Sequence, residues 1–231
     1  MQAIILVGGF GTRLRALFPD IPKPMAPING RPFLAYLLDS LQKQGITSVI
    51  FPVHYLGAKI QDYFQAQYAG MKLTYIEESQ PLGTGGAIVN ALSLVKSADP
   101  VFVLNGDTFV KLNYRAMFHQ HMQTKSTLTL ALRSVSDCSR YGKVVTEDGY
   151  ISEFREKGET GAGLINAGVY LLNPGIFKQY ALPQQFSFEK EFLLPHLDTL
   201  KPQSFITDDY FIDIGVPDDY ARASRELPLI A

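Results

Sequence analysis

The 231-residue sequence has one cysteine, no tryptophan and almost no excess charge. The single Cys138 excludes an intrachain disulfide and a metal site built from several cysteines, and it favours a cytoplasmic protein. A formal net charge of −1 argues against binding nucleic acid through bulk electrostatics. No apolar run approaches the roughly 20 residues that cross a membrane, and the N-terminus lacks the basic region of a signal peptide.

The remaining composition is that of a folded protein, with 46% hydrophobic and 12% aromatic residues. A chain of this length suits a single domain that folds without disulfide or metal staples. No repeat, low-complexity tract or linker interrupts the sequence. We therefore expect one domain over 1–231, with two halves, 1–125 and 126–231, that differ in their hydrophobic pattern.

The first half alternates short apolar runs with segments of helical periodicity. Runs typical of buried strands lie at 3–7, 48–53, 73–76 and 101–104. Amphipathic helices are expected at 34–41, 57–68, 88–95 and 114–122. Strands that alternate with helices in this way predict an open parallel sheet with helices on both faces.

The second half has shorter runs separated by turn signals such as Asp148-Gly149, which indicate antiparallel pairing. Its expected strands lie at 127–133, 141–145, 150–154 and 165–172, and its expected helices at 188–197 and 217–226. The predicted fold class is thus α/β: a Rossmann-like open, mostly parallel (mixed) sheet with a small antiparallel extension. Ligands of such sheets bind beyond the carboxyl ends of the strands.

A glycine-rich segment, Gly8-Gly9-Phe10-Gly11-Thr12-Arg13-Leu14, follows the first predicted strand. Its backbone N–H groups can approach phosphate oxygens closely, and Arg13 and Lys23 add cations. Lys23 has a proline on each side, so we expect a stiff extended segment that aims its ammonium group. The segment is not a dinucleotide fingerprint, because Leu14 replaces the third glycine, and no Walker A Gly-Lys-Ser/Thr follows.

Two more strand ends carry features suited to a site. The string Pro81–Ala87 holds three glycines, which we interpret as allowing close backbone approach to a flat ligand. The apolar run 101–104 is followed by Asn105, Gly106 and Asp107. At this end of the predicted strand, the carboxylate of Asp107 can hold Mg²⁺. This ion takes one or two protein carboxylates and otherwise phosphate and water.

A second carboxylate for that metal is expected at Asp213. It lies in the apolar stretch 210–217, where a charge without a role is costly. Asp218 and Asp219 follow Pro217 in the first turn of a predicted helix, where the helix dipole explains them without a function. The four histidines show no metal or catalytic spacing, and we expect all four to be structural.

Taken together, the glycine-rich segment, Pro22-Lys23-Pro24 and Pro81–Ala87 resemble the signature of sugar-1-phosphate nucleotidyltransferases, and the resemblance covers nearly the whole chain. It implies that the loop wraps the phosphates of an NTP, that Arg13 steadies the departing pyrophosphate and that Lys23 neutralises charge at the reacting phosphates. It also implies Asp107 and Asp213 as Mg²⁺ ligands. The implied nucleotide contacts are Leu6, Gly8, Gly9, Gly11, Thr12, Glu78, Pro81, Gly83, Thr84 and Gly106.

Three segments of the second half resemble the family's sugar-phosphate side. They are Arg140-Tyr141-Gly142, Glu156-Lys157 and the Asn-x-Gly-x-Tyr string Asn166–Tyr170. The resemblance implies that Lys157 contacts the sugar phosphate and that the sugar is contacted by Tyr141, Gly142, Glu156 and Asn166. The half 1–125 would then mainly bind nucleotide and the half 126–231 mainly sugar phosphate.

Within the family, the strings 81–87, 105–109 and 208–217 most resemble the guanylyltransferases that act on D-glycero-α-D-manno-heptose 1-phosphate. Mannose-1-phosphate guanylyltransferases and N-acetylmuramate-1-phosphate uridylyltransferases stay open as alternatives, because no residue chemistry here separates guanine from uracil. The implied partners are the NTP and the sugar 1-phosphate, with no nucleic acid or membrane. A homo-oligomer is compatible with the sequence.

Two other classes fit less well. A regulator that binds nucleotide sugars without catalysis would lack Lys23, Asp107 or Asp213, yet all three are present. An NAD(P)-dependent oxidoreductase is disfavoured by Leu14 and by the lysine segment. The missing catalytic histidine suits nucleotidyl transfer, since a sugar phosphate with a second pKa of about 6 is already ionised at neutral pH.

Overall fold

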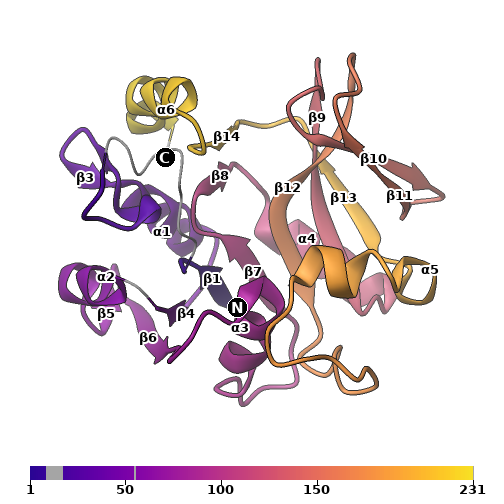
Figure 1. The fold of residues 1–231 in the computed structure, drawn as a ribbon, viewed down its shortest axis with the longest axis horizontal. Helices are drawn as coiled ribbons and strands as arrows, with labels where there is room; N and C mark the ends of the chain where they lie inside the picture. Colours follow the sequence, from indigo (N-terminus) through magenta and orange to yellow (C-terminus); the bar gives the residue numbers. More distant parts are fainter. Residues whose placement is uncertain (9–17, 55, 231) are drawn as a thin grey trace.

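The computed structural model describes residues 1–8, 18–54 and 56–230. A mixed ten-stranded sheet runs through the molecule, in the order β10-β11-β13-β9-β12-β7-β1-β4-β6-β5 (Figure 1). The chain thus forms the α/β architecture that the sequence predicts, with the strands of both halves joined in a single sheet.

The parallel part of the sheet comes from the first half of the chain. Its four neighbouring strands are β7 (Val101–Asn105), β1 (Gln2–Leu6), β4 (Ser48–Val53) and β6 (Met71–Glu77). The helices between and after them are α1 (Phe33–Lys43), α2 (Gly57–Phe64), α3 (Gly83–Leu92) and α4 (Tyr114–Thr124). The predicted alternation of strand and helix is therefore confirmed.

The second half continues the same sheet beyond β7. Its strands are β9 (Leu128–Val135), β10 (Gly142–Glu147), β11 (Tyr150–Lys157), β12 (Gly163–Leu172) and β13 (Gln203–Thr207). The β12 strand pairs antiparallel with both β7 and β9, whereas β13 runs parallel to β9. The predicted antiparallel extension is therefore an extension of the central sheet itself.

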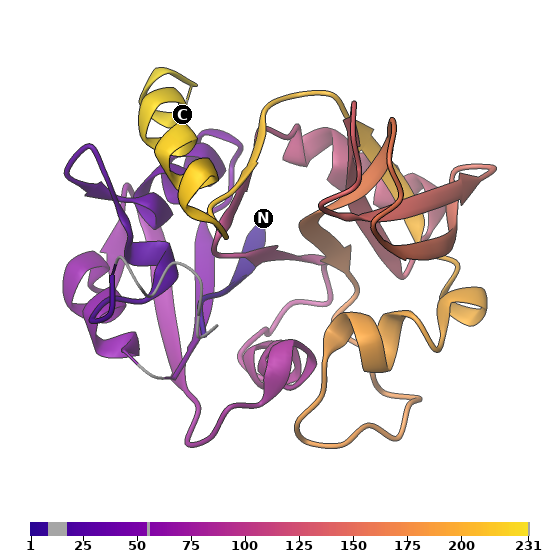
Figure 2. The same cartoon turned by 45° about the horizontal axis from the view of Figure 1, so that its top comes forward.

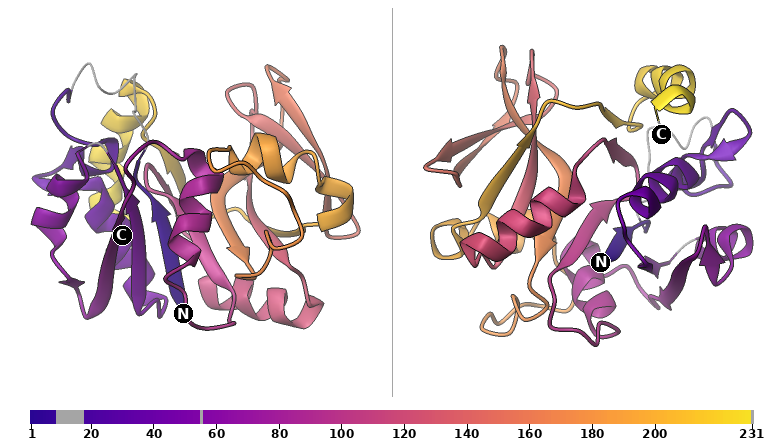
Figure 3. Two further views of the ribbon diagram at one scale, coloured as in Figure 1. Left: turned by 60° about the horizontal axis from the view of Figure 1, so that its bottom comes forward. Right: turned by 180° about the vertical axis from the view of Figure 1, so that it is seen from behind.

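Helices cover both faces of the sheet because the strands are apolar on both sides. In β1, Ile5 belongs to a core shared with α1, α2, α4 and α6 (Pro217–Ile230), while Ile4 belongs to a second core shared with α3. This second core also takes up η2 (Phe188–Leu193), a π-helical turn. The right view of Figure 3, from behind, shows that α1 and α4 lie on the face of the sheet that is turned away in Figure 1.

Two predicted helices are shorter than expected. The helix expected at 57–68 ends at Phe64, because Gln65 takes a positive φ of 56° and the chain turns into β5 (Gln67–Tyr68). The helix expected at 188–197 consists of η2 and a separate turn, α5 (Leu197–Leu200). Helical periodicity alone could not locate either break.

A two-stranded ribbon, which the sequence did not predict, joins distant parts of the chain. It pairs β8 (Thr108–Val110) antiparallel with β14 (Phe211–Asp213), so that Asp213 lies opposite Thr108. A second small hairpin, β2 (Pro27–Ile28) with β3 (Arg31–Pro32), follows a 3-10 turn, η1 (Lys23–Met25). The Tyr220 hydroxyl of α6 donates to the carbonyl of Pro27, which holds α6 beside this hairpin (Figure 2).

Across the described residues, no helix is both long and apolar enough to cross a membrane.

Candidate active site

The ammonium group of Lys23 lies between two carboxylates at the carboxyl end of the parallel strands. Its Nζ is 2.6 Å from Oδ2 of Asp107 and 3.4 Å from Oδ1 of Asp213. The lysine side chain is only 11% exposed, whereas the two carboxylates are 36% and 38% exposed. Three residues that the sequence singled out thus form one cluster, with the carboxylates open to a ligand.

The β8–β14 ribbon explains how residues so far apart come together. Asp107 directly precedes β8 and Asp213 ends β14. The N–H of Ile214 donates to the carbonyl of Asp107 over 3.1 Å, which fixes the two backbones side by side. The N–H of Gly215 donates to Oδ1 of Asp213 over 2.7 Å and orients that carboxylate.

Lys23 is not in the extended segment that its two prolines suggested. It begins η1, in which the N–H of Met25 donates to the carbonyl of Pro22 over 2.8 Å and that of Ala26 to Lys23 over 3.0 Å. Pro24 is compatible with this turn, because an N–H in the first helical turn needs no internal partner. The expectation of an extended backbone was therefore wrong. The lysine is nevertheless held in place, by this turn and by its ion pairs with Asp107 and Asp213.

The carboxylate pair fits a divalent cation. Burial, and next the negative charge of Asp107, raises the pKa of Asp213, so its charged form is disfavoured unless a cation stabilises it. In the described part of the chain no group of three or more potential metal-ligating residues occurs. Two carboxylates suffice for Mg²⁺, because substrate phosphates and water complete its coordination.

A small cavity of about 200 Å³ lies at the ends of β1, β4 and β6, and Leu6 in its wall accepts a hydrogen bond from Gly106, the residue before Asp107. The cavity collects six of the predicted nucleotide contacts: Leu6, Gly8, Glu78, Pro81, Gly83 and Thr84. Pro52, His54, Leu82 and Ala87 complete its wall. His54, which we expect to be structural, follows β4 and lines this cavity, and its Nδ1 lies 2.7 Å from the carbonyl oxygen of Glu78.

The three glycines of the string Pro81–Ala87 are explained by packing within the protein, without a ligand. A Cβ at Gly83 would lie 2.5 Å from the carbonyl oxygen of Phe186, one at Gly85 2.1 Å from its ring, and one at Gly86 2.3 Å from the carbonyl oxygen of Gln184. The close approach is therefore to the protein's own segment before η2. Gly106 likewise packs on β1, where its N–H donates to the carbonyl of Leu6 over 2.9 Å.

Among the residues predicted to contact the sugar, Tyr141 lies next to the β8–β14 ribbon. Its ring meets that of Phe211 edge to face, with 5.8 Å between centroids. Arg140 covers the Tyr141 ring and forms an ion pair with Asp219 of α6. The Asp219 side chain is 8% exposed, so it has a structural role as the partner of Arg140 in addition to its favourable position in the first turn of α6.

Asn166 is held by two hydrogen-bond partners, and the sequence did not predict that they would meet at this residue. Its Nδ2 donates to Oε1 of Glu189 over 2.8 Å and to the hydroxyl of Tyr170 over 2.9 Å, and Tyr170 also donates to Glu189. Burial raises the pKa of Tyr170 well above its usual value. Glu189 lies on η2, inside the helix that the sequence predicts at 188–197, but nothing in the sequence indicates that its side chain meets Asn166.

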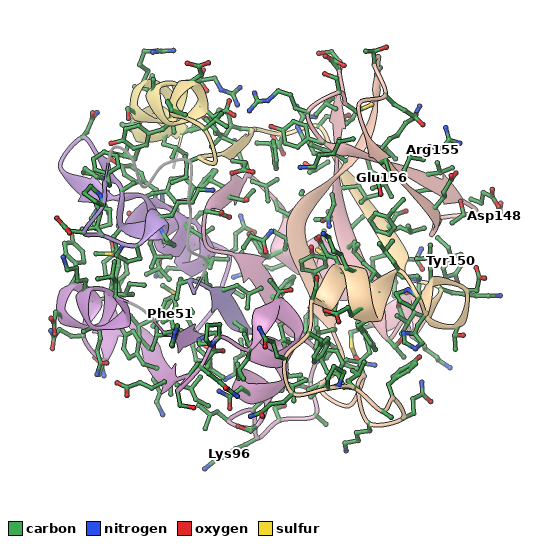
Figure 4. The ribbon with its side chains drawn as sticks, viewed as in Figure 1. Phe51, Lys96, Asp148, Tyr150, Arg155 and Glu156 are labelled. Carbon is green, nitrogen blue, oxygen red and sulfur yellow. The ribbon has the colours of Figure 1, made fainter. Side chains whose placement is uncertain are left out.

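Not every predicted residue joins these clusters. Glu156 and Lys157 are exposed at the end of β11, with Gly142 opposite Lys157 on β10. Figure 4 shows Glu156 in the half of the molecule built by the later strands, away from Phe51 in the parallel half. Four further predicted contacts, Gly9, Gly11, Thr12 and Arg13, lie outside the described residues.

Comparison with known proteins decides the family. The model of the nucleotidyl transferase family matches residues 2–228. The chain belongs to this family. Among curated nucleotidyl transferases, it is 46% identical over 98% of both chains to a protein of Aneurinibacillus thermoaerophilus named D-glycero-alpha-D-manno-heptose 1-phosphate guanylyltransferase. A protein of the same name from Campylobacter jejuni is 48% identical, over 95% of this chain and 97% of the relative.

A solved nucleotidyl transferase structure agrees with these sequence relatives. HddC from Yersinia pseudotuberculosis superposes with a TM-score of 0.88 at 38% identity, over 97% of this chain and 98% of HddC. HddC has also been solved in complex with GMP-PN. The Rossmann-like fold of this nucleotidyl transferase is thus confirmed, and enzymes of this family generally use a divalent metal.

Proposed function

We propose that this nucleotidyl transferase moves a guanylyl group from GTP to D-glycero-α-D-manno-heptose 1-phosphate, with Mg²⁺ as its metal. The substrate proposal rests on one observation: two relatives named for this reaction match nearly the full length of the chain at 46% and 48% identity. This identity favours the heptose over mannose 1-phosphate and N-acetylmuramate 1-phosphate, the alternatives from the sequence.

The chemistry is a displacement at phosphorus. An oxygen of the sugar phosphate attacks the α-phosphorus of GTP, the new P–O bond forms, and the bond from that phosphorus to the β-phosphate oxygen breaks to release pyrophosphate. Because the second pKa of a sugar phosphate is about 6, the attacking oxygen is already ionised and no general base is needed. What the protein must supply is positioning and balance of charge.

Lys23 is suited to the charge balance. Its side chain is only 11% exposed, and its ammonium pairs with Asp107, which follows the strand β7 beside β1. A buried cation next to a developing negative charge stabilises a transition state more than a solvated one does, because water screens it less. We assign Arg13, in the glycine-rich segment, the matching role at the departing pyrophosphate.

Asp107 and Asp213 would hold the metal. Bound Mg²⁺ supplies neutralisation of the triphosphate and fixes its geometry. The protein's part is to keep two hard oxygen ligands at one place, which the β8–β14 ribbon does through the hydrogen bonds of Ile214 and Gly215. Burial and the charge of Asp107 raise the pKa of Asp213, and a bound cation would favour its ionised form.

The sugar phosphate is assigned to the second half of the chain. Tyr141 packs on the strand that carries Asp213, so a sugar held by Tyr141 and Gly142 would lie close to the reacting phosphates. Asn166 is oriented by Glu189 and Tyr170, and Oε2 of Glu189 is an additional acceptor for a sugar hydroxyl. Glu156 and Lys157 are the exposed members of this proposed subsite.

A screen of pyrophosphate release tests the proposal. GTP, UTP, ATP and CTP are each combined with the 1-phosphates of heptose, mannose, glucose, N-acetylglucosamine and N-acetylmuramic acid, with and without Mg²⁺. We expect the highest kcat/KM for GTP with heptose 1-phosphate, and no release once the metal is chelated. Release with UTP and not GTP, or a preference for mannose 1-phosphate, would contradict the substrate proposal.

A further inference from the structure

The segment that leads into η2 docks on the start of α3, although the two come from different halves of the chain. The N–H of Gly85 donates to the carbonyl of Phe186 over 2.9 Å, and the N–H of Phe186 donates to the carbonyl of Leu82 over 3.0 Å. The N–H of Phe188 donates to Oγ1 of Thr84 over 2.9 Å. Figure 2 shows η2, in orange, beside α3, in magenta. These hydrogen bonds tie η2 to the first half.

The docking is also tight. None of the three glycines at the start of α3 has room for a Cβ, which would lie 2.5 Å or less from the docked segment. Close-packed contacts of this kind pass on a displacement, because protein interiors have low compressibility. A change at the start of α3 should therefore move the backbone that enters η2.

Phe188 connects this docked segment to the cluster around Asn166. Its ring is buried and meets the ring of Tyr170 edge to face, with 5.1 Å between centroids. The next residue, Glu189, accepts hydrogen bonds from Asn166 over 2.8 Å and from the hydroxyl of Tyr170. The backbone position of Phe188 therefore determines where the carboxylate of Glu189 lies.

The carboxylate of Glu189 in turn orients Asn166. The two hydrogens of Nδ2 go to Oε1 of Glu189 and to the hydroxyl of Tyr170. Oδ1 of Asn166 accepts from the N–H of Gly168 over 3.0 Å and has a second lone pair. Asn166 can thus offer a ligand an acceptor, as Oε2 of Glu189 can, and both acceptors suit sugar hydroxyls. A shift of Glu189 would turn the amide and displace both.

We propose that Thr84 is a positioning residue for the sugar phosphate. Its hydroxyl holds the backbone of Phe188, which places Glu189 and, through it, Asn166. This inference rests on the proposed function, which assigns Asn166 to the sugar. Thr84 belongs to α3 and lines the small cavity, so a residue of the first half determines the geometry of the sugar site. The division into a nucleotide half and a sugar half does not predict this role.

The substitution Thr84→Val tests the role, because valine keeps the shape of threonine but leaves the N–H of Phe188 facing a methyl group. With this variant we expect KM for heptose 1-phosphate to rise roughly 10-fold, the effect of one unsatisfied donor, and KM for GTP to change by less than about twofold. Thr84→Ser keeps the hydroxyl and should restore both constants. Initial rates of pyrophosphate release, with each substrate varied in turn, measure them.

A double-mutant cycle with Glu189→Ala shows whether Thr84 acts through Glu189. Without the carboxylate, the position of the Phe188 backbone has nothing to transmit to Asn166. The double variant should therefore have the same kcat/KM for the sugar phosphate as Glu189→Ala alone, since substitutions along one chain of contacts are not additive. Additive losses would show that Thr84 acts independently of Glu189 and would contradict the inference.

Thr124→Val is the matched control. The Thr124 hydroxyl donates to the carbonyl of Gln120 at the exposed end of α4, so the same substitution should leave both KM values unchanged. Thr84 is also exposed, and melting temperatures within about 2 °C of each other would show that Thr84→Val is folded.

The outcomes separate this inference from the proposed function. If Thr84→Val raises KM for GTP alone, the hydroxyl serves the nucleotide and the inference is wrong. Unchanged constants in Thr84→Val would also contradict it. If the unmodified enzyme prefers another NTP or another sugar 1-phosphate, the proposed substrates are wrong. The same comparison with the preferred pair then still decides whether Thr84 positions the sugar site.

Discussion

Lys23 and Asp107, 84 residues apart in the sequence, form an ion pair with 2.6 Å between Nζ and Oδ2. Asp213 completes the cluster from the other end of the chain, 3.4 Å from the same nitrogen. A lysine in this position neutralises the carboxylates and lies within the region where phosphates would bind. The cluster therefore links the stability of the fold to the proposed chemistry, and variants of it should change both.

Lys23→Met should lower turnover strongly while GTP still binds. We expect kcat to fall roughly 100-fold and KM for GTP to change by less than that, because a cation that stabilises developing charge contributes mainly in the transition state. Steady-state kinetics with pyrophosphate detection measure both constants. Lys111→Met, at an exposed residue just after β8, should leave kcat unchanged. A Lys23 variant that raises only KM would show a role in binding alone.

Asp213→Asn should abolish most Mg²⁺-dependent turnover and leave the fold intact. Burial raises the pKa of Asp213, so in the folded state its charged form is disfavoured. The folded protein then retains a proton that the unfolded chain has already released, and the contribution of Asp213 to stability rises as the pH falls through the raised pKa. Without Mg²⁺, the asparagine variant should melt at a higher temperature than the wild type at neutral pH, and this difference should shrink as the pH falls through the raised pKa of Asp213.

Asp218→Asn is the control for that experiment. Asp218 lies in the first turn of α6, is exposed, and has the same side chain as Asp213. Its variant should keep full activity and the wild-type dependence of melting temperature on pH. Loss of activity in both variants would indicate a general effect of charge near α6, and would remove the support for Asp213 as a metal ligand.

Arg140→Ala should loosen the connection between α6 and the loop before β10. The substitution leaves Asp219 buried with Arg222, 3.6 Å away, as its remaining partner. Because Arg140 is 55% exposed, we expect a loss of about 1 kcal/mol, less than for a fully buried pair. Thermal melts should show a decrease of about 2–4 °C, and KM for the sugar phosphate should rise because Tyr141 loses its neighbour.

Arg155→Ala is the comparison for Arg140. Arg155 pairs with Glu153 and Glu159, and all three side chains are at least 40% exposed. Exposed pairs of this kind contribute little, so neither melting temperature nor KM should change measurably. Equal effects of the two arginine substitutions would argue against a special role of the Arg140–Asp219 pair.

Gly215→Ala should inactivate the enzyme with little change in stability. The added Cβ would lie 3.0 Å from Oδ1 of Asp213 and 3.3 Å from Nζ of Lys23, so the cluster must rearrange. Gly175→Ala is the control, since the nearest atom to its Cβ would be 3.7 Å away, at the flexible Lys178 side chain. Kinetics and thermal melts of both variants distinguish a local disturbance from unfolding; normal turnover of Gly215→Ala would contradict a requirement for this tight geometry.

Sequence reasoning predicted the regular part of the fold because periodicity is a local property. The run at 48–53 and the heptad-like leucines of 34–41 correspond to β4 and α1 nearly residue for residue. Short elements were missed: β8 and β14 have three residues each, and their pairing depends on residues about a hundred positions apart, which no local pattern encodes. The same limit applies to β13, which inserts parallel to β9.

For the site, motif resemblance identified the charged residues but not the residues that they contact in the fold. Lys23, Asp107 and Asp213 were predicted individually, and the structure brings them together. Glu189 and Asp219 were not found as partners, because a carboxylate in an apolar or helical context gives no sign of which side chain it will meet. The glycines of the string Pro81–Ala87 were assigned to a ligand, whereas their closest neighbours belong to the segment at Phe186.

The pairing of β8 with β14 also determines at which stage of protein synthesis the site can form. The ribosome releases β1, β4, β6 and β7, and with them Lys23, Asp107 and the base cavity, long before it reaches Asp213. A nascent chain that ends before β14 can bury much of the parallel sheet yet lacks the second carboxylate. The pair of carboxylates is thus complete only once β14 has been synthesised and has paired with β8.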